Sequence, residues 1–132
     1  MGTMRNLADI FKALGDESRL KILALLLRYG ELCVCDIENV IGATQSKTSR
    51  HLRYLLHAGL VQDRREGVWV HYRMAGSPDG PIPHVRKMLK SLLTPELTAE
   101  LESGFQKWCC APGTSCSPAA LKAGQKAAAS CG

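Results

Sequence analysis

Apolar residues recur at helical spacing in four consecutive segments of the N-terminal half of the chain. The first segment, residues 7–14, is followed by a glycine, which is typical of a helix end. The second, residues 16–28, is apolar on nearly every face and is expected to be buried. Residues 34–41 form a third helix that Gly42 ends, and residues 44–58 form a fourth. The pattern predicts a mainly α-helical fold.

The fourth segment has one apolar face and one strongly polar face. Leu52, Leu55 and Leu56 face the core, and Thr44 caps the N-terminus. Two helices joined by a short turn containing Gly form a helix-turn-helix, whose second helix enters the major groove of DNA. Side chains at its start can hydrogen-bond base edges or phosphate. The candidates are Thr44, Gln45, Ser46, Lys47, Ser49 and Arg50. His51 either donates to phosphate or is a partly buried structural histidine.

Two β-rich runs follow the fourth helix. Residues 60–65 and 68–74 are separated by Glu66-Gly67, which predicts a two-residue hairpin. A hairpin after a helix-turn-helix makes a winged helix-turn-helix. Arg64 and Arg65 lie near its tip, where we expect them to grip phosphate beside the groove.

A second apolar stripe follows the turn-rich residues 77–83. It covers residues 85–93, breaks at Thr94-Pro95 and continues to Trp108. We interpret the stripe, together with the first helix, as a homodimer interface; simple packing on its own winged helix is the alternative. The predicted DNA-binding and dimerisation domain spans residues 1–108. Residues 109–132 are expected to be a cysteine-containing, partly flexible tail.

Charge strengthens the DNA-binding interpretation. The net charge is +5 and the isoelectric point is near 9.0, which favours an anionic partner. Residues 44–74 contain six Lys or Arg against two acidic residues, so they supply four of those five charges. The longest apolar run, residues 22–27, is far shorter than the roughly 18–20 residues that cross a bilayer. We expect no membrane segment, no secretory signal and a cytoplasmic protein.

Six cysteines in a cytosolic protein are more typical of metal ligands or redox groups than of structural disulfides. Cys33 and Cys35 begin the third helix, where the helix dipole favours thiolates. Residues two apart on a regular helix point about 200° from each other, so both can bind one ion only if the first turn opens. The other candidates are Cys109, Cys110 and Cys116. Cys131 is interpreted as a bystander.

Several motifs together resemble the ArsR/SmtB family of metal-responsive repressors. They are ALGDESRLKIL (residues 13–23), QSKTSRHL (45–52), AGLV (58–61) and REGVWVHYR (65–73). The resemblance implies a homodimeric winged-helix repressor that binds double-stranded operator DNA at an inverted repeat and is released by a toxic metal or metalloid. No cofactor is expected for DNA binding, and no nucleophile, nucleotide loop or second domain indicates an enzyme.

The resemblance extends to the cysteines. Residues 31–36, ELCVCD, resemble the segment by which family members bind arsenite, antimonite, cadmium or lead, and thiolates are donors that soft ions prefer. The third thiol of that pattern is replaced by Glu38. The C-terminal cysteines resemble an arsenite site of other relatives. Either Cys109, Cys110 and Cys116 form a self-contained site, or a C-terminal thiol joins Cys33 and Cys35 across the dimer.

The inducer therefore has three possible identities. The leading one is trivalent arsenic or antimony bound by cysteine thiolates. A redox switch, in which oxidation joins Cys33 to Cys35 or Cys109 to Cys116, is an alternative. Cadmium, lead or zinc is another.

Overall fold

A computed structural model describes residues 3–110 and shows helices that begin at the capping residues. The first helix, α1 (Met4–Leu14), ends at Gly15, as predicted. The second, α2 (Glu17–Tyr29), begins after Asp16, whose carboxylate accepts a hydrogen bond from the Arg19 backbone N–H at 3.0 Å. Residues 22–26 of α2 are buried, which confirms that this helix lies in the core.

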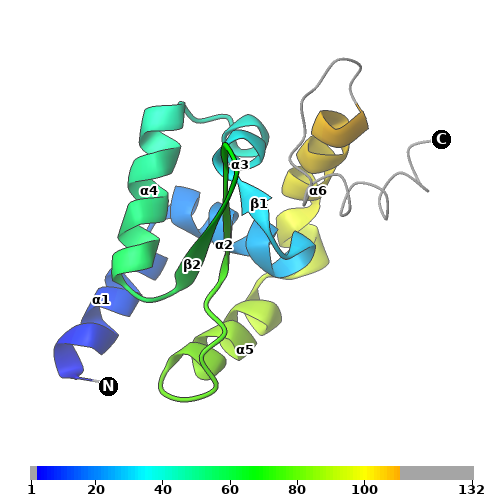
Figure 1. Ribbon diagram of the computed structural model, residues 1–132. Coiled ribbons are helices and arrows are strands. Elements are labelled where there is room, and N and C mark those ends of the chain that lie inside the picture. Colours follow the sequence, from blue (N-terminus) through cyan, green and yellow to red (C-terminus); the bar gives the residue numbers. More distant parts are fainter. Residues whose placement is uncertain (1–2, 111–132) are drawn as a thin grey trace.

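The next two helices form the predicted helix-turn-helix. The α3 helix (Val34–Ile41) ends at Gly42, whose left-handed conformation (φ 71°, ψ 28°) favours glycine. Three residues later α4 (Gln45–His57) begins after Thr44, which accepts a hydrogen bond from the Lys47 backbone N–H at 3.2 Å. Figure 1 shows α4 and α6 on opposite sides of the β-hairpin.

The wing is a three-stranded antiparallel sheet of order β1-β3-β2. Its hairpin joins β2 (Val61–Glu66) to β3 (Trp69–Met74), and β1 (Leu32–Cys33) adds a short strand that the apolar pattern did not predict. The turn is Gly67-Val68 and not Glu66-Gly67, because Glu66 pairs with Trp69. Gly67 has a φ of 60°, so the glycine is needed at the first central position of the turn.

Two C-terminal helices complete the fold. The α5 helix (Ile82–Leu92) starts one residue before Pro83, so it begins inside the segment predicted as a connector. The α6 helix (Pro95–Cys110) begins at the predicted proline. Phe105 of α6 is fully buried and stacks on Tyr29 of α2, with ring centroids 3.7 Å apart. The winged helix-turn-helix prediction is thus confirmed, with α6 packed on the same core.

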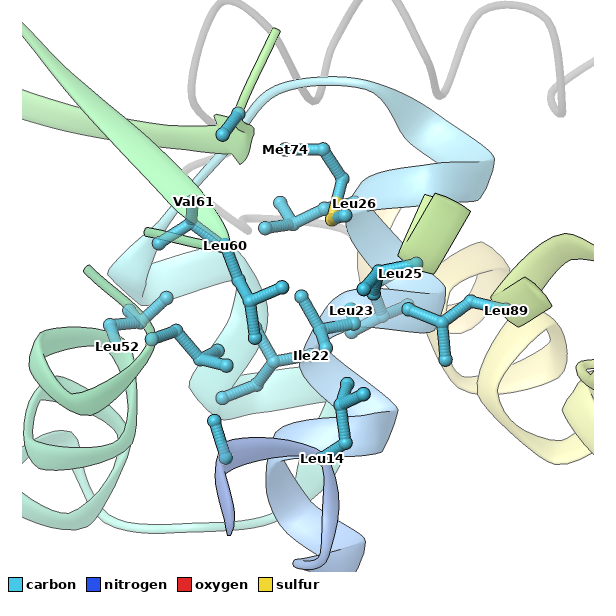
Figure 2. Packing of buried hydrophobic residues seen from close by; sticks show 14 of the residues in the cluster. Leu14, Ile22, Leu23, Leu25, Leu26, Leu52, Leu60, Val61, Met74 and Leu89 are labelled. Atoms are coloured by element: carbon cyan, nitrogen blue, oxygen red, sulfur yellow. The ribbon is translucent and has the colours of Figure 1, made fainter. Parts of the chain in front are cut away.

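One core joins all of these elements (Figure 2). Leu23 and Leu26 of α2 lie at its centre, with Leu52 from α4, Leu60 just before β2 and Leu89 from α5. Among the described helices, none is both long and apolar enough to cross a bilayer. The core holds the helix-turn-helix and the wing in a fixed relative position.

Candidate nucleic-acid interface and thiol sites

The N-terminal half of α4 presents the predicted polar face to solvent. Thr44, Gln45, Ser46, Lys47 and Arg50 are exposed, and Ser49 is half-buried. Thr48, between them, is fully buried with Leu52 and Leu55. Within residues 3–110, no ion pair engages Lys47 or Arg50. These side chains are available to an external partner, while the opposite face anchors the helix.

His51 and Arg19 join α4 to the start of α2. His51 Nδ1 lies 3.4 Å from Arg19 Nη1 and 3.9 Å from Asp16 Oδ2. Arg19 also donates from Nε to the Ala13 carbonyl at 2.9 Å, and its guanidinium lies 4.1 Å from the centroid of the Tyr54 ring. Arg19 therefore ties α1, α2 and α4 together. His51 is half-buried beside this contact, and its predicted role toward phosphate stays a prediction.

Arg64 and Arg65 of β2 have different surroundings. Arg64 pairs with Glu31 and with Glu66, whereas no ion pair in the described part of the chain engages Arg65. Hydrogen bonds from Arg64 hold the pKa of the Glu31 carboxyl below its usual value. Arg65 is thus an available cation beside α4. To contact a phosphate, Arg64 would first have to break an ion pair with Glu31 or Glu66.

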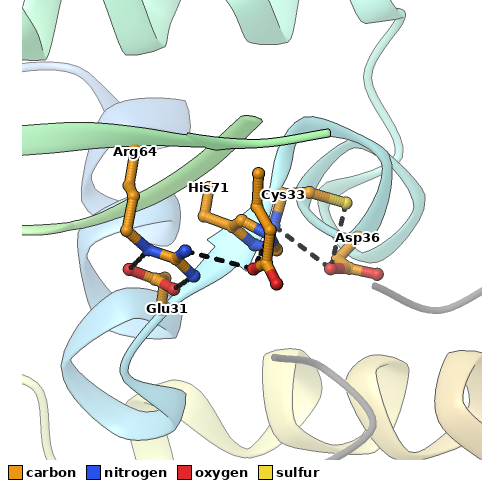
Figure 3. Close-up of polar contacts among 6 residues, drawn as sticks. Glu31, Cys33, Asp36, Arg64 and His71 are labelled. Atoms are coloured by element: carbon orange, nitrogen blue, oxygen red, sulfur yellow. Dashed lines mark hydrogen bonds and ion pairs between the residues drawn. The ribbon is translucent and has the colours of Figure 1, made fainter. Parts of the chain in front are cut away.

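Cys33 lies just before α3, in extended conformation (φ −89°, ψ 168°), and is 2% exposed. Its Sγ donates to Asp36 Oδ2 at 3.1 Å, and its backbone N–H donates to the same oxygen at 3.2 Å (Figure 3). Asp36 is fully buried. The thiol of Cys33 is therefore shielded from solvent and directed at a carboxylate.

Cys35 lies inside the first turn of α3 and is half-buried. Asn39 Nδ2 donates to the Cys35 carbonyl at 2.7 Å and lies 3.8 Å from its sulfur. Because Cys33 stands outside the helix, the 200° separation expected for two helical residues does not apply to this pair. The first turn itself is helical and is closed by hydrogen bonds from Cys33 to Asp36, so shared ligation by Cys33 and Cys35 stays a prediction.

The third described thiol is Cys109, half-buried near the end of α6 and packed against the core. Cys110 is described only in its backbone, and Cys116 and Cys131 lie outside the described residues. In the part of the chain that the structure describes, no three His, Cys, Asp or Glu residues form a group able to hold a metal ion. The predicted three-thiol site therefore stays a prediction.

His71 links the wing to the thiol residues. In the strand register His71 lies opposite Arg64 of β2 on one side and Cys33 of β1 on the other, so the three residues form one row across the sheet. His71 is fully buried, and its Nε2 lies 3.5 Å from Glu66 Oε2. Such complete burial is typical of a structural histidine.

Large apolar side chains remain exposed on the terminal helices. Phe11 of α1 is 57% exposed, and Leu92 and Leu97 of α5 and α6 are 60% and 66% exposed. Val85 and Leu89 of the same stripe are buried within the chain. Part of the stripe thus packs on its own domain and part faces outward, and its role as a homodimer interface stays a prediction. A groove lined by residues of both α1 and the start of α5 shows that these helices are neighbours.

Three residues of the site were missed from the sequence: Glu31, Asp36 and Trp108. An acidic residue three positions after an N-cap is the pattern of a capping box, which is the signal that identifies Asp36. Trp108 Nε1 donates to Asp36 Oδ1 at 3.0 Å from 72 residues away. No local pattern predicts that contact.

Known proteins resemble this chain in sequence and in fold. Residues 16–63 match the family model described as bacterial regulatory protein, arsR family. The chain is 52% identical over 67 residues to the arsenical resistance operon repressor of Escherichia coli, covering 51% of this chain and 57% of that protein. It is 42% identical over 85 residues to the arsenic resistance transcriptional regulator ArsR2 of Pseudomonas putida, covering 64% and 71%. The first two curated relatives are covered over 57% and 63% of their length.

A cadmium resistance transcriptional regulatory protein CadC homologue of Staphylococcus aureus is 44% identical over 69 residues, covering 52% of this chain and 57% of that protein. Among solved structures, the homodimeric winged helix-turn-helix DNA-binding domain Mb0332 of Mycobacterium bovis has a TM-score of 0.60 and 31% identity, covering 73% and 85%. The AntR antimony-specific transcriptional repressor has a TM-score of 0.57 and 31% identity, covering 71% and 79%.

Proposed function

The chain belongs to the arsR family of bacterial regulatory proteins, and we propose that it is a homodimeric repressor that leaves operator DNA when its cysteines bind trivalent arsenic or antimony. Relatives and structural neighbours are transcriptional regulators, so the chain is a regulator and not an enzyme. One observation carries the proposal: the exposed polar face of α4 follows α3 after a three-residue turn, and α3 has Cys33 as its N-cap and Cys35 in its first turn.

DNA binding is assigned to the exposed start of α4 and to the wing. Gln45 is suited to adenine and Arg50 to guanine, because each can form two hydrogen bonds to a base edge. Thr44, Ser46, Lys47 and Ser49 supply contacts to bases or phosphate. Arg65 supplies a phosphate contact from the wing, with His51 and Arg64 as further candidates. Burial of Thr48, Leu52 and Leu55 supports this assignment, because it fixes which face of α4 points outward.

A homodimer is supported by the exposed apolar residues of α1, α5 and α6. Leaving Phe11, Leu92 and Leu97 in water is unfavourable, and a second copy of the chain offers an identical patch to cover them. To bind two half-sites one DNA turn apart in an inverted repeat, the two α4 helices of a dimer must lie about 34 Å apart. A small change in that separation costs affinity at both half-sites.

The inducer is assigned to the cysteines because thiolates are the donors that soft ions prefer. Each As–S bond replaces one hydroxyl of arsenous acid, and the thiol proton leaves with it as water, so no oxidant is required. Cys109, Cys110 and Cys116 are the proposed ligands, with Cys33 and Cys35 as the alternative partners of a C-terminal thiol. Burial of Cys33 at 2% exposure favours the C-terminal cysteines as the first contact for the ion.

The test measures operator binding of the full chain, reduced, by fluorescence anisotropy at fixed salt, with and without arsenite. We expect the unloaded protein to bind and stoichiometric arsenite to weaken binding by at least about tenfold. The Cys109→Ser, Cys110→Ser, Cys116→Ser triple variant should bind operator normally and ignore arsenite, while Cys131→Ser is the matched control. If arsenite still released the triple variant from operator DNA, the C-terminal site would be refuted.

X-ray absorption of the arsenite-loaded protein then identifies the ligands. Replacing each cysteine in turn should remove one sulfur neighbour for each true ligand and none for a bystander. The cadmium-resistance relative favours a second candidate inducer, a soft divalent ion. If cadmium but not arsenite releases the protein from operator DNA, the inducer is a soft divalent ion. If peroxide alone releases it, the cysteines form a redox switch.

A further inference from the structure

Asp36 is a buried carboxylate whose two oxygens face two different elements. Oδ2 accepts hydrogen bonds from the Cys33 backbone N–H and Sγ, at 3.2 and 3.1 Å, just before α3. Oδ1 accepts the indole N–H of Trp108 on α6 at 3.0 Å. Asp36 has no exposed surface. One side chain thus joins the N-terminus of α3 to the last turn of α6.

The two helices are closely packed along the rest of this contact. Gly104 of α6 lies against α3: a Cβ added there would lie 3.6 Å from Val40 Cγ1 and 3.6 Å from the Val40 carbonyl oxygen. One turn further on, Trp108 reaches Asp36, and Cys109 and Cys110 follow it directly. A shift of the C-terminal end of α6 therefore acts first on the Trp108–Asp36 hydrogen bond.

Breaking that hydrogen bond is unfavourable while Asp36 stays buried. A buried carboxylate that loses a donor loses far more than an exposed one, because no water replaces it. The structure can respond by moving Asp36, and Asp36 carries the N-terminus of α3 with it. Since α3 joins α4 through only three residues, this movement changes how α4 is presented.

We propose that Asp36 and Trp108 are positioning residues that couple ion binding at the C-terminal cysteines to the helix-turn-helix. This inference rests on the proposed function. Ion binding beside Trp108 displaces the end of α6, the indole leaves Asp36, and the first turn of α3 rearranges. The contact explains how cysteines at the far end of the chain reach the DNA-binding helices.

The first experiment separates ion binding from its effect on DNA. Trp108→Phe removes the indole N–H and keeps an aromatic ring. Asp36→Asn keeps only one side-chain oxygen, so it cannot accept hydrogen bonds from both Cys33 and Trp108 as the two carboxylate oxygens do. Glu102→Gln is the matched control, because it removes the charge from a different α6 contact, the ion pair with Arg28 of α2 at 3.0 Å. For each variant, operator affinity is measured without arsenite and at saturating arsenite, with arsenite stoichiometry measured separately.

We expect Trp108→Phe and Asp36→Asn to bind arsenite with wild-type stoichiometry. The ratio of the two operator affinities should fall from at least about tenfold to less than about threefold. Glu102→Gln should keep the wild-type ratio. A wild-type ratio in Trp108→Phe would overturn the inference, and this variant decides the question if Asp36→Asn fails to fold.

A second measurement follows the hydrogen bond itself. The chain has two tryptophans, so Trp69→Phe leaves one indole N–H resonance, that of Trp108. We expect this proton to exchange slowly with solvent in the unloaded protein and at least about tenfold faster after arsenite is added. If arsenite releases the protein from DNA but the exchange rate of the Trp108 indole proton does not change, the inference is overturned. A wild-type protein that binds no operator would instead refute the proposed function.

Discussion

Arg64 Nη2 lies 2.5 Å from Glu31 Oε1, so a wing residue is paired with the residue that begins the ELCVCD segment. Arg64 Nε lies 3.3 Å from the other Glu31 oxygen, and Nη1 lies 3.1 Å from Glu66 Oε2. These hydrogen bonds raise the pKa of Arg64 above its usual value and lower that of Glu31. In this structure Glu31 and Glu66 thus hold the guanidinium that the sequence predicted to contact phosphate.

Glu31→Gln should therefore strengthen operator binding. The change removes a negative charge and one of the two carboxylate partners of Arg64, so we expect affinity to rise several-fold and the salt dependence to steepen by up to one unit of log Kd per log salt. Glu17→Gln is the matched control, because it removes the same charge from an exposed position on α2. The measurement is anisotropy between 50 and 200 mM salt.

Arg64→Gln provides the complementary result. In the wild-type background it should leave the salt slope nearly unchanged, whereas in the Glu31→Gln background it should reduce the slope by nearly one unit. A full one-unit loss in the wild-type background would mean that Arg64 contacts phosphate despite Glu31, as the sequence interpretation expected.

The elements that the sequence predicts best are those whose ends have local causes. Asp16 and Thr44 accept hydrogen bonds from backbone N–H groups three residues later, and Gly42 adopts a left-handed conformation. Such caps depend on neighbouring residues, so helix ends can be read from the sequence. The hairpin was predicted, but its turn lies one residue later than predicted. The alternating strand pattern does not show whether Gly67 is the first or the second central residue of the turn.

The contacts that organise the candidate site are not local. Trp108 meets Asp36 across 72 residues, and Arg64 meets Glu31 across 33. The two-residue strand β1 is too short to show an alternating pattern, although it aligns Cys33 with His71. The sequence therefore indicates which residues carry the chemistry, while the fold determines which of them are neighbours.

Two substitutions on α4 should separate base recognition from phosphate contact. Gln45→Ala should cost about 1–3 kcal/mol on the preferred operator and little on unrelated DNA, because a base contact carries sequence information. Lys47→Ala should weaken binding to all sequences and reduce the salt slope by nearly one unit. Both side chains are exposed, so folding should be unaffected. Equal losses on every sequence for Gln45→Ala would contradict its assignment to base recognition.

Charge placed on the exposed apolar surface should prevent dimerisation. Phe11→Glu and Leu92→Glu each put a carboxylate where two copies are proposed to meet, so we expect monomers at micromolar concentration and much weaker operator binding. Val68→Glu is the matched control for the oligomeric state alone, since Val68 is 92% exposed at the tip of the wing, which is itself proposed to contact DNA. Sedimentation velocity measures the outcome. A dimer that persists in the Phe11→Glu, Leu92→Glu double variant would place the interface elsewhere.

The charge of Asp16 should contribute to stability only above acidic pH. The Arg19 backbone N–H, 3.0 Å from Oδ2, lowers the pKa of this carboxyl below its usual value. A carboxyl with a lower pKa in the folded state stabilises the fold above its unfolded pKa of about 3.9, and the contribution is lost as pH falls through the folded pKa. Asp16→Asn keeps a capping oxygen without a charge. Urea unfolding at equal protein concentration should therefore show the wild type more stable by about 0.5 kcal/mol at pH 7, and equal to the variant near pH 2. A difference that stays constant across this range would show that the cap acts without its charge.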